Sequence, residues 1–254
     1  MALMKAAVIP EFFARLKKAI PEPETELEYD TVYQLLVAVV LSAQATDAGV
    51  NRATEPLFKI VKTPQQMLDL GERKLISFIK TIGLFRTKAK NVMGLSKLLV
   101  DRHGGEVPRS HEALQELPGV GRKTANVVMN VAFGEATIAV DTHIFRVGNR
   151  TGLAPGKNPL EVELRLLKRV PEEYRLHAHH WLILHGRYTC KARLPECWRC
   201  PVADLCRYKP KTLEPSARPA RTATPRSSAA RTASGRTAAT PTAGRSRSRP
   251  SRPR

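Results

Sequence analysis

The stretch LPGVGRKTA, residues 117–125, lies between two segments whose apolar residues recur at helical spacing. Gly119 and Gly121 flank Val120 and permit a tight turn whose backbone comes close to another molecule. A new helix is expected to begin near Arg122, so its free N–H groups face the turn and attract phosphate. The stretch predicts a helical hairpin that grips a nucleic-acid backbone, although similar turns also join helices that bind nothing.

Lys123 lies in the first turn of the expected helix. A lysine is usually a solvated surface charge. A helix N-terminus is a poor place for a cation, and partial burial would penalise the charge further. Both effects favour the neutral amine, which is the nucleophilic form. Lys123 is therefore a candidate nucleophile.

Asp141 follows the apolar run Ile138–Val140 and opens the segment DTHIFR. Aspartate is a preferred N-cap, so a helix is expected to start here. One carboxylate oxygen can cap the helix while the other faces a cleft. A structural role and a catalytic role are therefore compatible.

The four cysteines of the chain all lie within residues 190–206, in the pattern C-x6-C-x2-C-x5-C. Disulfides are disfavoured because no secretory signal precedes them and a disulfide scaffold spreads its cysteines along the chain. Structural zinc sites usually have two close pairs, whereas this pattern has one. Iron–sulfur clusters take four thiolates with longer gaps. The spacing favours an iron–sulfur cluster, with zinc as the alternative, held by Cys190, Cys197, Cys200 and Cys206.

The rest of the chain up to about residue 210 has helical periodicity, broken by Pro and Gly, and no convincing alternation of strand type. The predicted fold class is all-α, with short connections. The expected helical segments are residues 12–20, 32–41, 67–70, 75–82, 92–100, 124–131, 160–170 and 176–184.

The 254 residues carry a formal net charge of +19, which indicates a polyanionic partner, nucleic acid before a membrane surface. The longest apolar run, Leu35–Leu41, is too short to span a bilayer. Pro10 and Glu11 interrupt any signal core. We expect a protein without membrane segments or secretion signal, located in the cytoplasm and associated with the nucleoid.

Residues 211–254 hold eleven basic residues against one acid, and Leu213 is their single large aliphatic residue. Such a segment cannot bury enough apolar surface to fold, so a disordered basic tail is expected. It is either a nucleic-acid-binding arm or a solubilising appendage.

Taken together, LPGVGRKTA, VDTHIFR, HGRYTC and the cysteine stretch resemble the endonuclease III family of iron–sulfur, helix-hairpin-helix DNA glycosylases with lyase activity. The resemblance includes LSAQATD (residues 41–47) and TIGL (residues 81–84) and covers residues 10–210. It implies two helical domains flanking a DNA-binding cleft, in a monomeric protein. A six-helix domain (25–135) would end in the hairpin, and residues 1–24 and 136–210 would carry a [4Fe-4S] cluster.

The resemblance also implies a chemistry. Lys123 would attack the sugar C1′ of a flipped-out oxidised pyrimidine in duplex DNA, and Asp141 would stabilise the charge that develops on the sugar. A Schiff base would follow, and β-elimination would cut the strand 3′ to the abasic site. Gln44 and Leu84 would enter the duplex, although taken alone they could be an exposed helix residue and an ordinary apolar contact. The remaining implied DNA contacts are Gly119, Val120, Gly121, Arg122, Lys191 and Arg193.

Two other functions share much of this pattern. The adenine-specific relatives have the same fold and cluster, but they lack the hairpin lysine and carry a further C-terminal domain. Lys123 and the low-complexity tail argue against them. A DNA-binding protein that has lost the chemistry would not need both Lys123 and Asp141. The cluster is expected to have a structural role.

Overall fold

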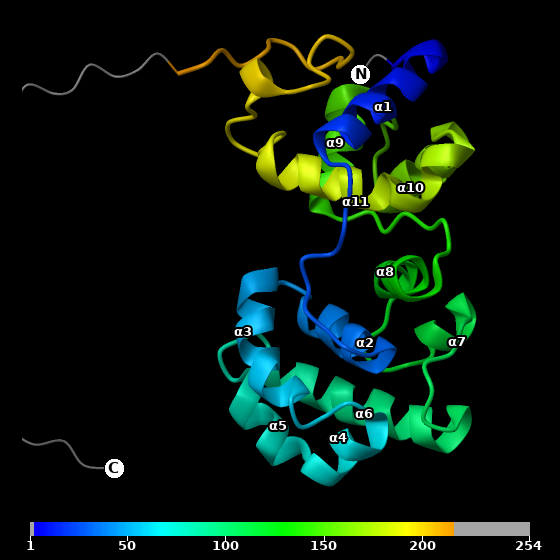
Figure 1. Ribbon diagram of the computed structural model, residues 1–254, viewed down its shortest axis with the longest axis vertical. Helices are drawn as coiled ribbons and strands as arrows, with labels where there is room; N and C mark the ends of the chain where they lie inside the picture. Colours follow the sequence, from blue (N-terminus) through cyan, green and yellow to red (C-terminus); the bar gives the residue numbers. More distant parts are fainter. Residues whose placement is uncertain (1–2, 216–254) are drawn as a thin grey trace, which may run out of the picture. The chain divides into compact units, whose positions relative to one another are not determined.

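The computed structural model describes residues 3–215, and the basic tail lies largely outside this range. Within it the chain forms eleven α-helices, two short 3-10 helices and no strand, which confirms the all-α fold class (Figure 1). No helix in the described part is long and apolar enough to cross a membrane. The elements are η1 (Ala6–Val8), α1 (Ile9–Ala19), α2 (Val32–Leu41), α3 (Asp47–Phe58), α4 (Pro64–Leu70), α5 (Glu72–Ile79), α6 (Phe85–His103), α7 (His111–Gln115), α8 (Arg122–Phe133), α9 (Thr142–Thr151), α10 (Pro159–Arg169), α11 (Glu172–Tyr188) and η2 (Cys197–Arg199).

Helix α2 is the centre of the first of two hydrophobic cores, which residues from α2 to α8 build. A capping box between Thr31 and Gln34 starts the helix, and every residue from Tyr33 to Leu41 is buried. The buried Gln34 also donates from Nε2 to the carbonyl oxygens of Phe58 (2.9 Å) and Val61 (2.8 Å). A polar side chain is therefore fully paired inside an apolar core.

The second core is built from α1 together with α9, α10 and α11. Phe13 of α1 packs beside Trp181 of α11, with ring centroids 6.4 Å apart. The indole Nε1 of Trp181 donates to the carbonyl oxygen of Ile20 at 2.9 Å. The N-terminal helix is thus held against the C-terminal helices, as Figure 1 shows. The chain up to Glu214 forms one compact unit, so the expected domain limits remain a prediction.

The first core has one helix more than expected. Seven helices lie between residues 25 and 135, rather than six. Gly71 separates α4 from α5 because its φ of 76° lies in the left-handed region, which interrupts a helix. Helix α3 was not among the expected segments, and it begins where Thr46 accepts a hydrogen bond from the N–H of Gly49.

Candidate active site and DNA interface

The turn between α7 and α8 has the hairpin geometry that its glycines predict. Gly119 has a φ of 81°, and a Cβ there would lie only 2.8 Å from Nδ2 of Asn91. Any other residue would be strained at this φ and would force the Asn91 side chain of α6 to move. Val120 is 5% exposed and anchors the turn in the first core, while Gly119 and Gly121 are exposed. Val120 therefore holds the turn against the first core, while the backbone of the two glycines remains accessible to another molecule.

Helix α8 begins at Arg122, as predicted, and no side chain caps its N-terminus. The first N–H groups of α8 therefore have no partner within the helix and point out of its open end. The partial positive charge at this end attracts an anion. The local geometry is that of a phosphate site built from backbone alone.

Lys123 is the second residue of α8, and its side chain is exposed. The expected partial burial is wrong, because Lys123 lies on the open side of the first turn. Across from it, burial lowers the pKa of His179 on α11 to about 3, and the charges of His180, Lys123 and Arg187 lower it further. This neutral imidazole brings no positive charge of its own near the lysine.

Arg122 is exposed, but its guanidinium is paired with a buried carboxylate. Its Nε lies 3.1 and 3.2 Å from the two carboxylate oxygens of Glu163, and its Nη2 lies 2.6 Å from Oε1. Glu163 belongs to α10 and is only 5% exposed. The fork-shaped pair ties the start of α8 to the second core. A phosphate contact by Arg122, as predicted, would have to compete with this pair.

Asp141 caps α9, as predicted: its Oδ1 accepts a hydrogen bond from the N–H of Ile144 at 2.8 Å. The second oxygen accepts no hydrogen bond from any described residue, and the side chain is half-buried. Two residues on, His143 packs against Gly186 of α11, where a Cβ would come within 2.9 Å of the His143 Cβ. This close approach fixes the first turn of α9 on α11.

A cleft of about 480 Å³ lies between the two cores beside this turn. His143 lines it from α9, Arg187 and Tyr188 line it from α11, and Asp47 lines it from α3. The guanidinium of Arg187 forms ion pairs with Asp47 and with Glu26. These ion pairs, like the Arg122–Glu163 pair, link the two cores, and the three residues that form them line the cleft.

Gln44 and Leu84 share an unusual backbone conformation. They are the only non-glycine residues in the described chain with positive φ, at 55° and 58°. Left-handed backbone is unfavourable for such side chains and is retained mostly at functional positions. Both side chains are exposed, Leu84 by 61%. Gln44 lies in the turn after α2, so it is not an exposed helix residue. Leu84 lies immediately before α6 and is too exposed to be an ordinary apolar contact.

The cysteines Cys190, Cys197, Cys200 and Cys206 line one enclosed cavity, and all four are free thiols. Burial raises the pKa of Cys190, and it raises that of Cys200 to about 11. Hydrogen bonds already reach the sulfurs: the N–H of Tyr208 lies 3.4 Å from Sγ of Cys206, and Arg150 Nη1 lies 3.8 Å from Sγ of Cys190. Among the described residues, no three His, Cys, Asp or Glu side chains converge on one metal ion.

The loop between the first two cysteines is held by Arg150, whose guanidinium donates to the carbonyl oxygens of Lys191 (2.6 Å) and Ala192 (2.7 Å). Lys191 itself is paired with Glu196 at 2.7 Å. Arg193 is exposed at the tip and has no ion-pair partner among the described residues. Of the two basic residues predicted to contact DNA here, Arg193 is the one free to do so.

Sequence reasoning gave no role to Glu163 or to Arg187, although Arg187 lies within the HGRYTC stretch. Nothing in their local spacing distinguishes them from the charged residues that line any amphipathic helix. Their importance comes from partners that are distant in the chain.

Comparison with known proteins is consistent with this geometry. Residues 37–172 match the profile of the HhH-GPD superfamily of base excision DNA repair proteins. Endonuclease III of Haemophilus influenzae is 59% identical over 201 residues, which cover 79% of this chain and 95% of that protein. Endonuclease III of Escherichia coli strain K12 is 56% identical over the same coverage.

Solved structures give the same result. A trapped endonuclease III–DNA covalent intermediate superposes with a TM-score of 0.76 at 45% identity, covering 81% of this chain and 97% of the other. A non-covalent endonuclease III–DNA complex also reaches 0.76, at 44% identity. The hairpin, Lys123 and Asp141 all lie within the residues that match the family profile. The chain belongs to the endonuclease III family of the HhH-GPD superfamily of base excision DNA repair proteins.

Proposed function

We propose that this protein is a bifunctional DNA glycosylase and abasic-site lyase that removes oxidised pyrimidines from duplex DNA. One observation carries the proposal: an exposed lysine stands at the uncapped N-terminus of the hairpin helix, and a cleft is lined by His143 in the first turn of α9, the helix that Asp141 caps. The lysine supplies a nucleophile, the helix end holds a phosphate, and the carboxylate supplies negative charge.

DNA binding follows from the exposed elements. The backbone of Gly119 and Gly121 and the first N–H groups of α8 hold a phosphate without reading sequence. Gln44 and Leu84 approach the duplex from two different turns and fill the space that a flipped nucleotide leaves. Arg193 adds a phosphate contact from the cysteine loop. The damaged base would then enter the cleft beside Arg187.

The chemistry begins at Nζ of Lys123. A bond forms from Nζ to C1′ while the glycosidic C1′–N bond breaks, and the base leaves with the bonding electrons. The ring oxygen then leaves C1′, and an iminium links the sugar to Lys123. Removal of a C2′ proton expels the 3′ phosphate and cuts the strand. Asp141 stabilises the positive charge on the sugar through its free oxygen and assists the proton transfers.

A strand-cleavage assay tests this function on a duplex that carries one oxidised pyrimidine. We expect release of the base together with the β-elimination product on the 3′ side. The undamaged duplex, and a duplex in which the lesion is replaced by an adenine mispair, serve as controls and should remain intact. If the protein binds lesion and abasic DNA but cleaves neither, it is a DNA-binding protein that has lost the chemistry. Cleavage of the adenine mispair alone would favour the adenine-specific activity.

We further propose that the four cysteines hold a [4Fe-4S] cluster. The residues fit such a group: four thiols line one enclosed cavity, and donors already lie near two sulfurs. A tetranuclear cluster accepts one thiolate per iron, so its ligands need not converge on a single point as zinc ligands do. When bound, the cluster would supply structure rather than a reaction step. It would fix the loop that carries Arg193.

Metal analysis tests the cluster. Protein purified under anaerobic, iron-replete conditions should be yellow-brown and contain about four iron and four sulfide per chain. A variant with Cys200→Ser is the matched control, because it removes one ligand and should lower the iron content. Colourless protein with one zinc per chain, made under the same conditions, would contradict the assignment.

A further inference from the structure

The part of the cysteine loop from residue 190 to residue 200 contains three basic residues and a single acid, Glu196. The carboxylate of Glu196 pairs with two of the three cations. Its Oε1 lies 2.7 Å from Nζ of Lys191, and its Oε2 accepts a hydrogen bond from Nε of Arg199 at 2.6 Å. Arg193 is the third cation, and it has no ion-pair partner among the described residues.

The backbone fixes the position of Glu196. Its N–H donates to the carbonyl oxygen of Thr189 at 2.9 Å, and Pro195 immediately before it is buried. The side chain of Glu196 is 17% exposed, whereas that of Lys191 is 46% exposed. Because the lysine is accessible, its carboxylate partner, rather than burial, keeps Nζ from another anion.

Lys191 and Arg199 differ in what else holds them. Nη2 of Arg199 also donates to the carbonyl oxygen of Tyr188 at 2.8 Å. Nζ of Lys191 has Glu196 as its single hydrogen-bond partner among the described residues. Loss of the carboxylate would therefore release Lys191 and leave Arg199 tied to the end of α11.

We propose that Glu196 limits the cysteine loop to one phosphate contact, through Arg193, by withholding Lys191 from DNA. The inference rests on the proposed function. A phosphate that bound Lys191 would have to replace a charge-assisted hydrogen bond and approach a carboxylate of like charge, whereas Arg193 exchanges only water and counterions. Glu196 therefore lowers the affinity for damaged and undamaged duplexes alike, because phosphate contacts carry no sequence information.

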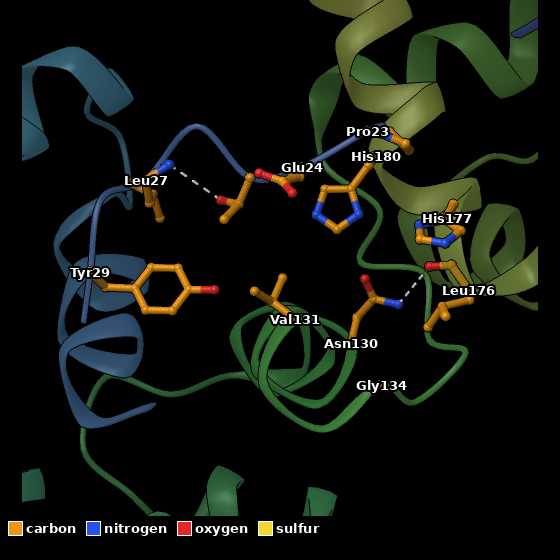
Figure 2. Close-up of a pocket in the computed structure, with 11 residues that line it drawn as sticks. Pro23, Glu24, Leu27, Tyr29, Asn130, Val131, Gly134, Leu176, His177 and His180 are labelled. Atoms are coloured by element: carbon orange, nitrogen blue, oxygen red, sulfur yellow. Dashed lines mark hydrogen bonds between the residues drawn. The ribbon is translucent and has the colours of Figure 1, made fainter. Parts of the chain in front are cut away.

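Glu24 is a glutamate without this role. It lines a pocket of about 520 Å³ at the C-terminal end of α8, the opposite end from Lys123, where Figure 2 shows it with Asn130 and His180. Glu24 is exposed and has no ion-pair partner among the described residues. Its replacement by Gln removes one negative charge and releases no cation. Glu24→Gln is therefore the matched control for Glu196→Gln.

The test measures the affinity of the full-length, iron-loaded protein for a duplex with a reduced abasic site across a salt series. The reduced sugar has no aldehyde and cannot form an iminium, so cleavage does not follow binding. Glu196→Gln should bind about tenfold more tightly at about 0.1 M salt, and the slope of log affinity against log salt should steepen by about 0.9, the value for one further phosphate contact. Glu24→Gln should match the parental protein.

Lys191→Gln identifies the released cation. In the parental protein it should change the affinity by less than about twofold, because Glu196 already occupies the lysine. Arg193→Gln removes the same charge from the same loop and should flatten the slope by about 0.9. In the Glu196→Gln background, Lys191→Gln should return the slope to the parental value. The two single variants need no change at Glu196, so their comparison remains decisive if Glu196→Gln loses its iron.

Four outcomes would overturn the inference and leave the proposed function intact. They are an unchanged slope in Glu196→Gln that retains its iron, an equal gain in Glu24→Gln, a gain that survives Lys191→Gln, and a loss in Lys191→Gln alone as large as that in Arg193→Gln. If the parental protein binds neither the abasic nor an undamaged duplex, the proposed function is wrong and this inference fails with it.

Discussion

Replacing Lys123 with Ala should abolish covalent trapping of the protein on abasic DNA by borohydride. Borohydride reduces the iminium between an amine and the sugar, and without the amine no iminium forms. We expect strand cleavage at the abasic site to fall by more than about 10³-fold. Affinity for abasic DNA should change little, because the backbone N–H groups of the hairpin remain. A gel-shift assay and a trapping assay on the same duplex measure the two effects separately.

Lys97→Ala is the control for this experiment. Lys97 is an exposed lysine on α6, paired with Asp101 at 2.9 Å, and it lies away from the cleft residues. Its removal takes away the same charge and should leave trapping unchanged. If Lys123→Ala still traps at the parental level, another amine is the nucleophile and the assignment of the site is wrong.

The second large effect is expected at Asp141. Asp141→Asn should slow excision of an oxidised pyrimidine by about 10²- to 10³-fold, because the negative charge that stabilises the sugar cation is lost. The melting temperature should change little, because Asn caps a helix about as well as Asp. Excision kinetics and thermal unfolding of the same preparation separate catalysis from capping.

Asp141→Ala completes the comparison. Alanine cannot accept the hydrogen bond from Ile144, so this variant should lose about 1 kcal/mol of stability as well as the activity. Near-parental excision by Asp141→Asn, together with a destabilised Asp141→Ala, would make Asp141 a helix cap and nothing more.

Local signals in the sequence were enough for much of the fold. The expected segment 32–41 coincides with α2, and the start of α8 at Arg122 and the cap at Asp141 were both predicted. Each depends on chemistry within a few residues: a capping box, a glycine turn, a carboxylate before a helix. Helix α3 was missed because its apolar residues are spread among polar ones and Pro56 lies within it.

The parts of the site that depend on distant residues could not be predicted in this way. Glu163 gains its partner only because the fold brings Arg122, 41 residues earlier in the chain, against it. Arg187 meets Asp47 across 140 residues. The left-handed backbone of Gln44 could not be predicted either, because glutamine rarely adopts this conformation and no neighbouring residue indicates it. Pairings set by tertiary packing leave no periodic trace in a single sequence.

The pair between Arg122 and Glu163 has a consequence for the ionic strength at which the enzyme works. Because Glu163 offsets the charge of Arg122, the hairpin meets the phosphate with neutral N–H groups. Charged contacts release condensed counterions from DNA and weaken as salt rises, whereas dipolar contacts do so far less. The hairpin's grip should therefore persist when salt has screened the basic residues elsewhere. When the protein slides along DNA through its basic residues, the N–H groups of the hairpin would still hold one phosphate beside the reacting sugar.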